Sequence, residues 1–257
     1  MKIMILGAGK MGIFFTDLLS FDHEVAVLDK DPKRLRFIYN AIRLQLPVEI
    51  EGFAPDLLIN CVTLNHTIAA FEATLPYLKP NCIISDVASV KNNLKEFYAT
   101  CGFPYVSTHP MFGPTFANLS NLAEENTIII TEGDHLGKIF FKDLYTKLKL
   151  RIFEFTFEEH DKTVAYSLGI PFASTLVFLA TMEHQDAPGT TFKRHMNIAR
   201  GLLSEDDYLL TEILFNPRTP HQIARIKEKL TALQDIIVAK DSENMKVFLA
   251  DVREKIK

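Results

Sequence analysis

Short apolar runs alternate with longer amphipathic segments over the first 155 residues of the chain. In the amphipathic segments, apolar residues recur every three or four positions, as in helices that pack one face on a core. Asp31 followed by Pro32 predicts a helix start, with a helix over residues 31–42. Strands that alternate with helices predict an α/β fold, a doubly wound Rossmann-type parallel sheet with helices on both faces. The predicted strands are residues 2–6, 24–29, 56–62, 82–87, 103–110, 126–131 and 151–155.

The alternation of strands and helices ends near residue 157. Three later segments have helical spacing, and none of them has the pattern of a strand: residues 158–168, 206–215 and 221–256. We therefore predict an α/β domain over residues 1–156 and an all-helical domain over residues 157–257.

One apolar stretch in the helical part, residues 166–182, is long enough to raise the question of a membrane. It has 17 residues, slightly fewer than a bilayer span requires, and it contains Gly169 and Pro171. We interpret it as a helix buried in a bundle or in a subunit interface, and we expect no membrane partner. The helical domain has more apolar surface than it can easily bury alone, which predicts a homodimer through this domain.

Composition narrows the class of protein further. The net charge is −4 with acidic and basic residues interspersed, so no basic surface for nucleic acid is expected. The three cysteines form no C-x-x-C pair, which indicates reduced thiols, and no signal-peptide pattern is evident, so we expect a cytoplasmic protein. The eight histidines show no spacing typical of metal ligands, and we predict no metal site.

Residues 5–12, ILGAGKMG, contain the spacing G-x-G-x-x-G at Gly7, Gly9 and Gly12. The motif follows a predicted strand and opens a predicted helix, and Asp29 ends the next strand, the context in which it predicts a dinucleotide site. Gly9 lets the backbone approach the pyrophosphate, and the helix N-terminus carries a partial positive charge. Asp29 favours NAD over NADP, because a carboxylate accepts a hydrogen bond from the ribose 2′-hydroxyl and repels a 2′-phosphate.

Two further segments end at the carboxyl edge of the sheet, where a nicotinamide would meet a substrate. They are SDVASVK at residues 85–91 and THPMFGP at residues 108–114. His109 has the chemistry for alcohol oxidation, since a neutral imidazole accepts the hydroxyl proton as hydride leaves. A histidine that merely bonds to the backbone of a turn is the alternative. Ser89 and His109 follow consecutive strands, so we expect them to lie close together.

The combination of DVASVK and HPMFGP behind an N-terminal G-x-G-x-x-G resembles the prephenate/arogenate dehydrogenase family of tyrosine biosynthesis. Residues 158–172, EEHDKTVAYSLGIPF, are similar to the start of the family's helical domain. The resemblance implies a dinucleotide-binding domain, a helical dimerisation domain, and the oxidative decarboxylation of a cyclohexadienol. It implies that His109 bonds the C4 hydroxyl and takes its proton, and that Ser89 faces this hydroxyl and orients the histidine.

The resemblance also extends the set of candidate site residues. Family members often hold the substrate's side-chain carboxylate with an arginine of the helical domain, and residues 192–200, FKRHMNIAR, offer candidates there. Gly169 and Phe172 stand where many members carry histidines. The expected catalytic residues are His109 and Ser89; the expected cofactor contacts are Gly7, Gly9, Lys10, Met11, Gly12, Asp29, Val62 and Asp86; the expected substrate contacts are Arg194, Asn197, Arg200 and Gly113.

We favour prephenate as substrate, with 4-hydroxyphenylpyruvate as product, and keep arogenate, which would give tyrosine directly, as the alternative. Two other classes of function remain open. One is a different enzyme of the same architecture, a 3-hydroxyacid dehydrogenase or an imine reductase. The other is a regulator that binds NAD(H) without chemistry.

Overall fold

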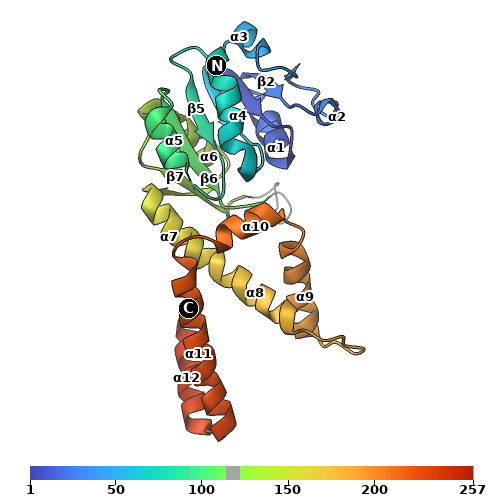
Figure 1. Ribbon diagram of the computed structural model, residues 1–257, viewed down its shortest axis with the longest axis vertical. Helices are drawn as coiled ribbons and strands as arrows, with labels where there is room; N and C mark the ends of the chain where they lie inside the picture. The colour runs from blue at the N-terminus through green and yellow to red at the C-terminus, as the bar shows by residue number, and fades with distance from the viewer. Residues whose placement is uncertain (92, 114–121, 257) are drawn as a thin grey trace. The chain divides into compact units, whose positions relative to one another are not determined.

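A computed structural model describes residues 1–91, 93–113 and 122–256 (Figure 1). The chain divides into two compact units, Met1–Asp161 and Lys162–Lys257. Helix α7 (Phe157–Ser167) carries the chain from the first unit into the second and begins at the predicted domain boundary. We propose that the two units are the two domains expected from the sequence.

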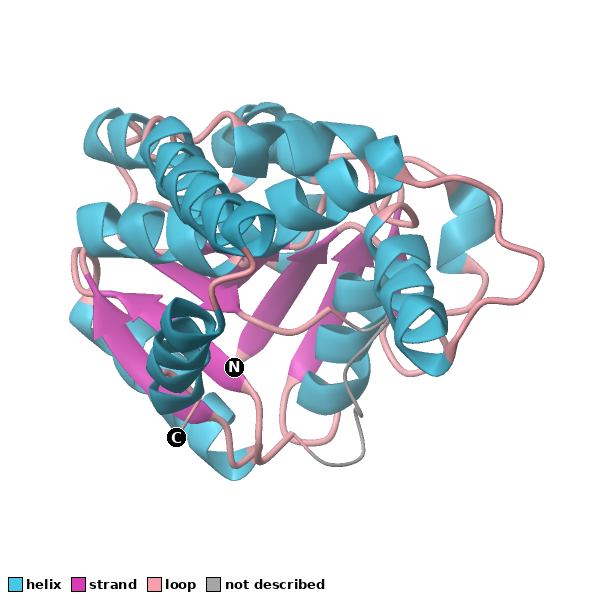
Figure 2. Cartoon of the chain, turned by 90° about the horizontal axis from the view of Figure 1, so that it is seen from below, coloured by secondary structure: helices cyan, strands magenta, loops and turns pink. Residues whose placement is uncertain are grey.

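The first unit is built on one eight-stranded sheet with the order β3-β2-β1-β4-β5-β6-β7-β8 (Figure 2). Neighbouring strands pair in parallel except β6 and β7, which pair antiparallel, so the sheet is mostly parallel. The strands are β1 (Lys2–Leu6), β2 (Glu24–Leu28), β3 (Ile42–Leu44), β4 (Leu57–Asn60), β5 (Ile83–Asp86), β6 (Tyr105–Pro110), β7 (Asn126–Ile130) and β8 (Arg151–Phe155).

The predicted sheet was wrong in two details. The helix expected over residues 31–42 ends early, as α2 (Pro32–Leu35). Ile42, the last residue of the expected helix, begins the edge strand β3, which was not predicted. Two of the three residues in β3 are exposed, so the strand lacks the buried apolar run that marks the others. The reversed direction of β7 and β8 had no signal in the periodicity, because parallel and antiparallel strands can carry similar apolar runs.

Helices cover both faces of the sheet because its central strands are apolar on both sides. Ile3 and Ile5 of β1 pack in one cluster with Phe15 of α1, whereas Met4 and Leu6 pack in the opposite cluster with Phe71 of α4. Alternate residues of a strand point to opposite faces, which explains this division. The helices of this unit are α1 (Lys10–Leu19), α2, α3 (Glu49–Phe53), α4 (Thr67–Thr74), α5 (Leu94–Thr100) and α6 (His135–Lys147), with 3₁₀ turns at Leu64–His66 and Leu75–Tyr77.

The start of α1 lies very close to the end of β1. A β-carbon on Gly12 would lie 1.8 Å from the carbonyl oxygen of Gly7, so only glycine permits this approach. Gly7 itself has φ of +92°, a conformation that L side chains rarely adopt. These two glycines therefore set the tight turn between strand and helix.

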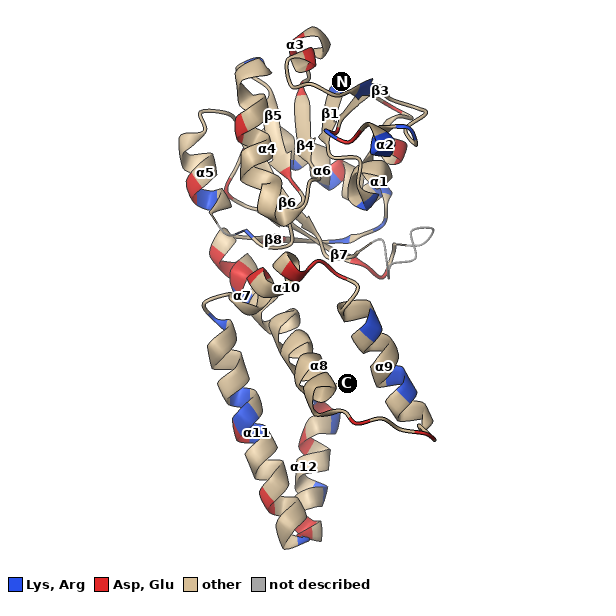
Figure 3. Ribbon diagram, turned by 45° about the vertical axis from the view of Figure 1, so that its right-hand side comes forward, with Lys and Arg blue, Asp and Glu red and all other residues tan. Residues whose placement is uncertain are grey.

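In its described part, the second unit consists of helices: the end of α7, then α8 (Gly169–Thr181), α9 (Thr190–Leu202), α10 (Asp207–Leu214), α11 (Thr219–Ala239) and α12 (Ser242–Glu254). Figure 3 shows no Lys, Arg, Asp or Glu along α8, in contrast to α9. Of the residues of α8, only Gly169 is buried, and Val177 is 60% exposed. The single chain therefore does not bury this helix in a bundle, which leaves the predicted subunit interface as a proposal.

The continuous helical stretch Phe157–Thr181 is long and apolar enough to cross a membrane by length and composition alone. Core helices of water-soluble proteins meet the same criterion, so the stretch is weak support for a membrane span.

Replacing Gly12 with alanine should lower the free energy of unfolding by about 3 kcal/mol, the upper part of the usual range for overpacking, because the backbone must move to admit the methyl group. Chemical denaturation of the purified protein measures the loss. Gly52→Ala is the matched control, since no atom lies within 4 Å of the added β-carbon there. Equal stability of the two variants would contradict the close approach of α1 to β1.

Candidate functional site

The glycine loop between β1 and α1 borders a pocket of about 340 Å³ at the carboxyl ends of the first strands. Gly9 is the N-cap of α1, and nothing lies within 4 Å of where its β-carbon would be. That open space is where a pyrophosphate would approach the helix N-terminus. Gly7, Gly9, Asp29 and Val62 line the pocket together, while Gly12 supports the loop and Lys10 and Met11 lie in the first turn of α1.

Asp29 ties the glycine loop to the end of β2. One carboxylate oxygen accepts a hydrogen bond of 2.7 Å from the backbone N–H of Ala8, and the other accepts one of 2.8 Å from that of Asp31. Lys30 and Arg34 line the same pocket. The site offers a carboxylate, an open glycine and a helix N-terminus, which together fit a dinucleotide.

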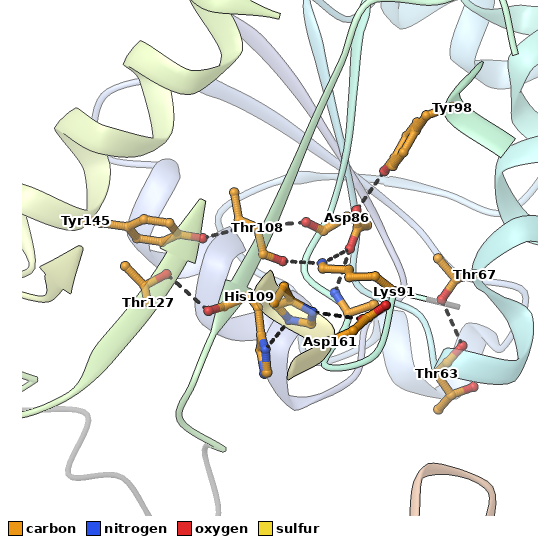
Figure 4. A network of polar contacts seen from close by, with 12 residues as sticks. Thr63, Thr67, Asp86, Lys91, Tyr98, Thr108, His109, Thr127, Tyr145 and Asp161 are labelled. Atoms are coloured by element: carbon orange, nitrogen blue, oxygen red, sulfur yellow. Dashed lines mark hydrogen bonds and ion pairs between the residues drawn. The ribbon is translucent and has the colours of Figure 1, made fainter. Parts of the chain in front are cut away.

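A buried ion pair joins the two segments that follow the middle strands (Figure 4). Asp86 ends β5, and its Oδ1 accepts a hydrogen bond of 2.5 Å from Lys91 Nζ; both side chains are at most 1% exposed. Lys91 also donates to the carbonyl oxygen of Thr108 at 2.7 Å, and Tyr98 donates to Asp86 Oδ2 at 2.7 Å. Each charge is thus satisfied inside the protein.

Asp86 was expected to contact the cofactor, but the structure gives its carboxylate other partners. Lys91 and Tyr98 occupy its two oxygens, and the N–H of Ala88 adds a third hydrogen bond that shapes the turn after β5. The side chain does not line the pocket beside the glycine loop. We therefore assign Asp86 to holding Lys91 and the turn that carries Ser89.

His109 lies near the end of β6 and is only 4% exposed. Its Nδ1 is 2.9 Å from Nε2 of His160, a fully buried residue of α7. Burial lowers the pKa of His109 well below its ordinary value of 6.5, and the charges of His160 and Lys91 act in the same direction. The imidazole of His109 is therefore neutral near pH 7, as a proton acceptor must be.

His160 is a contact of His109 that the sequence did not predict. Ser89 is half-buried, and the described residues include no hydrogen-bond partner for its side chain, whereas His160 contacts the ring of His109 directly. The segment EEHD pointed to the start of the helical domain but not to this contact. Residues 51 positions apart, on a strand and a helix, have no sequence spacing that reveals a shared site.

The second unit holds the remaining candidates. Asn197 and Arg200 of α9 lie on one face, where Arg200 Nη1 donates to Asn197 Oδ1 at 3.0 Å, and both line a pocket of about 490 Å³. Arg194 is exposed and does not line this pocket. In the first unit, Gly113 is exposed, and Pro114 of the motif HPMFGP lies outside the described residues. Within the described residues, no three His, Cys, Asp or Glu side chains gather as a metal site would require.

Comparison with known proteins identifies relatives of this chain. A family model described as the nucleotide-binding domain of prephenate dehydrogenase matches residues 20–152, just over half of the chain. A probable arogenate/prephenate dehydrogenase of Methanocaldococcus jannaschii is 22% identical over 73% of the chain and 45% of its own length. The T-protein of Enterobacter agglomerans is 21% identical over 96% of the chain and 64% of its own length. The chain thus spans about half to two thirds of the length of these relatives.

Solved structures share the fold over nearly the whole chain. Prephenate dehydrogenase from A. aeolicus, in complex with hydroxyphenyl propionate and NAD⁺, superposes with a TM-score of 0.84 at 20% identity and covers 99% of this chain and 96% of that one. Synechocystis arogenate dehydrogenase has a TM-score of 0.75 at 19% identity and covers 99% and 98%.

Lys91→Ala should lower the free energy of unfolding by about 3–5 kcal/mol, because it leaves the carboxylate of Asp86 charged and unpaired in the interior. Urea denaturation measures the change. Lys95→Ala removes an exposed lysine of α5 nearby and should change stability by less than about 0.5 kcal/mol. If both variants lose equally little free energy of unfolding, the ion pair of Asp86 and Lys91 does not hold the two segments together.

Proposed function

The chain belongs to the prephenate dehydrogenase family, and on this basis we propose that it catalyses the NAD-dependent oxidative decarboxylation of prephenate to 4-hydroxyphenylpyruvate. The observation that carries the proposal is the buried, neutral His109 near the carboxyl end of β6, held at Nδ1 by His160. That contact leaves Nε2 to accept a proton from a substrate.

The reaction requires one proton acceptor from the protein. The O–H bond at C4 of the ring breaks and its proton passes to Nε2 of His109 as C4 is oxidised. The carbon–carboxylate bond then breaks, carbon dioxide leaves and the ring becomes aromatic, and the C4 oxygen takes the proton back from His109 to give the phenol. When bound, NAD⁺ supplies the acceptor for the hydride from C4. We place Ser89 beside the same hydroxyl, because Asp86 Oδ1 accepts from the N–H of Ala88 and so fixes the turn that carries it.

Gly7, Gly9, Asp29 and Val62 hold the cofactor in this proposal, with Gly12, Lys10 and Met11 as the supporting first turn of α1. Asp29 favours NAD, since a carboxylate in this pocket would repel the 2′-phosphate of NADP. The NAD⁺ complex of the A. aeolicus enzyme supports the same choice.

Arg200, with Asn197 beside it, is the proposed anchor for the substrate's side-chain carboxylate, because both line the pocket of the second unit. Arg194 does not line this pocket and is left out of the proposed anchor. Gly113 stays a candidate substrate contact, since among the described residues no atom lies within 4 Å of where its β-carbon would be. Glu183 lines the same pocket as Arg200. A carboxylate there would suit the ammonium group of arogenate, which makes arogenate the second candidate substrate.

We also propose that a second copy of the chain covers α8, whose apolar residues are largely exposed in one chain. Exposed Leu230 and Val238 of α11 and Val247 of α12 extend the apolar surface available for such a homodimer. The apolar stretch is thereby assigned to a subunit interface rather than a membrane, and the enzyme to the cytoplasm.

The test of the function is NADH formation by the purified protein with prephenate or arogenate, each offered with NAD and with NADP. We expect turnover with prephenate and NAD. His109→Ala should lower kcat by about 10²–10⁴-fold, the usual contribution of a general base, with NAD binding retained. Turnover by arogenate alone would select the second substrate. NAD binding without turnover of either substrate would indicate a regulator, and an active His109→Ala would contradict the assignment.

The pH dependence follows from the neutral state of His109. Because burial lowers the pKa of His109 below 6.5, kcat/KM should persist as the pH falls through 6.5 and be lost only further below, where the imidazole takes a proton. Steady-state kinetics from about pH 5 to pH 8 measure this limb. Circular dichroism over the same range serves as the control for unfolding. A loss of activity centred at or above pH 6.5 would contradict a buried neutral base.

A further inference from the structure

Two neutral imidazole rings face each other inside the first unit. Nδ1 of His109 is 2.9 Å from Nε2 of His160, and both side chains are buried. Burial lowers the pKa of each ring below its ordinary value of 6.5, so neither ring is charged near pH 7. A neutral ring has one N–H and one bare nitrogen, so a hydrogen bond between the rings needs a donor on one and an acceptor on the other.

Two arrangements of the protons satisfy this requirement, and they differ in what His109 offers to a substrate. In the first, Nδ1 of His109 donates to Nε2 of His160, and Nε2 of His109 is bare and accepts a proton. In the second, Nε2 of His160 donates to Nδ1 of His109, so His109 carries its own proton on Nε2 and has no acceptor left. A separation of 2.9 Å fits both arrangements, so this contact alone does not select the active form of the base.

Asp161 faces the far nitrogen of His160. Its Oδ1 is 3.4 Å from Nδ1 of His160. In the first arrangement His160 carries its proton on this nitrogen and directs it toward the carboxylate. In the second, a bare nitrogen would face a carboxylate oxygen, two acceptors with no proton between them. The carboxylate therefore favours the first arrangement.

The other charged groups near the rings act on their charge and not on their tautomer. Lys91, in the turn after β5, lies near both rings, and Asp86 of β5 acts on His160. Both tautomers of a neutral ring have the same net charge, so a distant ion discriminates between them weakly. Asp161 differs because it contacts a ring nitrogen directly.

We propose that Asp161, acting through His160, holds His109 in the tautomer that accepts the substrate proton. Asp161 and His160 are positioning residues in this scheme and touch neither substrate nor cofactor. The inference rests on the proposed function, because it concerns the base of that reaction. Nε2 of His109 takes the proton of the C4 hydroxyl and returns it to the same oxygen in the product, while the proton on Nδ1 stays in place. The tautomers at the end of a turnover are therefore those at its start.

Asp161→Asn is the decisive variant, because an amide donates to Nδ1 of His160 as readily as it accepts from it and no longer disfavours the inactive arrangement. We expect kcat to fall about 10–10²-fold, less than for His109→Ala, with the Kd of NAD unchanged. The side chain is 39% exposed, so the variant should fold, which circular dichroism checks. Asp161→Glu keeps a carboxylate and should recover most of the loss. An unchanged kcat in Asp161→Asn, or an equal loss in Asp161→Glu, would overturn the proposal.

Glu158→Gln is the matched control for charge. Glu158 lines the same pocket of about 430 Å³ as Asp161 and Lys91, and the substitution removes one negative charge from it. We expect an unchanged kcat. An equal loss in Glu158→Gln and Asp161→Asn would indicate a general effect of charge and would overturn the proposal.

A double variant tests whether Asp161 acts through His160. Glutamine in place of His160 keeps an oxygen that accepts from Nδ1 of His109 but has no ring tautomer for Asp161 to set. Adding Asp161→Asn to His160→Gln should therefore lower kcat by less than about twofold. A further loss as large as in the unaltered protein would show that Asp161 acts by another route and would overturn the proposal.

Nitrogen-15 NMR of labelled histidines reads the tautomers without turnover. We expect the Nδ1–H tautomer for both His109 and His160 near neutral pH, and a larger share of Nε2–H on both rings in Asp161→Asn. Unchanged tautomers in Asp161→Asn, or the Nε2–H tautomer on His109 in an active enzyme, would overturn the proposal alone. The expected tautomers without turnover of prephenate or arogenate would overturn the proposed function and leave the role of Asp161 in setting the tautomer intact.

Discussion

The ion pair between Asp86 and Lys91 is the interaction on which the proposed site depends. A charged group in the interior is tolerated only when it is paired and hydrogen-bonded, and here each charge has two or more partners. Through Lys91 the pair joins the turn after β5 to the carbonyl of Thr108, one residue before His109. The segment that carries Ser89 and the segment that carries His109 are therefore held by the same two charges.

The same pair also affects the chemistry of the base. A positive charge near a buried imidazole opposes its protonation, so Lys91 and burial together keep His109 in the form that accepts a proton. Asp86 balances Lys91 so that the interior does not carry a net isolated charge. The structural support of the site and the reactivity of its base thus come from one arrangement of charges.

The oxidation and the proton transfer would then be served by different groups. In the proposed function the glycine loop and Asp29 would hold a dinucleotide at the ends of β1 and β2, while His109 would take the proton near the end of β6. His160 contacts His109 at Nδ1, which leaves Nε2 of His109 for the substrate. A buried base suits this reaction, because the proton that it accepts returns to the product.

The sequence by itself determined the features that depend on local geometry. The apolar runs marked seven of the eight strands, because a strand buried on both faces needs apolar residues throughout. The spacing of Gly7, Gly9 and Gly12 with Asp29 marked the pocket that we propose for the dinucleotide, because turn, helix start and strand end lie within one continuous segment. Only the tertiary structure decided the edge strand β3, the direction of β7, the engagement of Asp86 with Lys91, and the contact between His109 and His160. These features depend on which segments the folded chain brings together across long separations, and no local pattern of residues encodes that proximity.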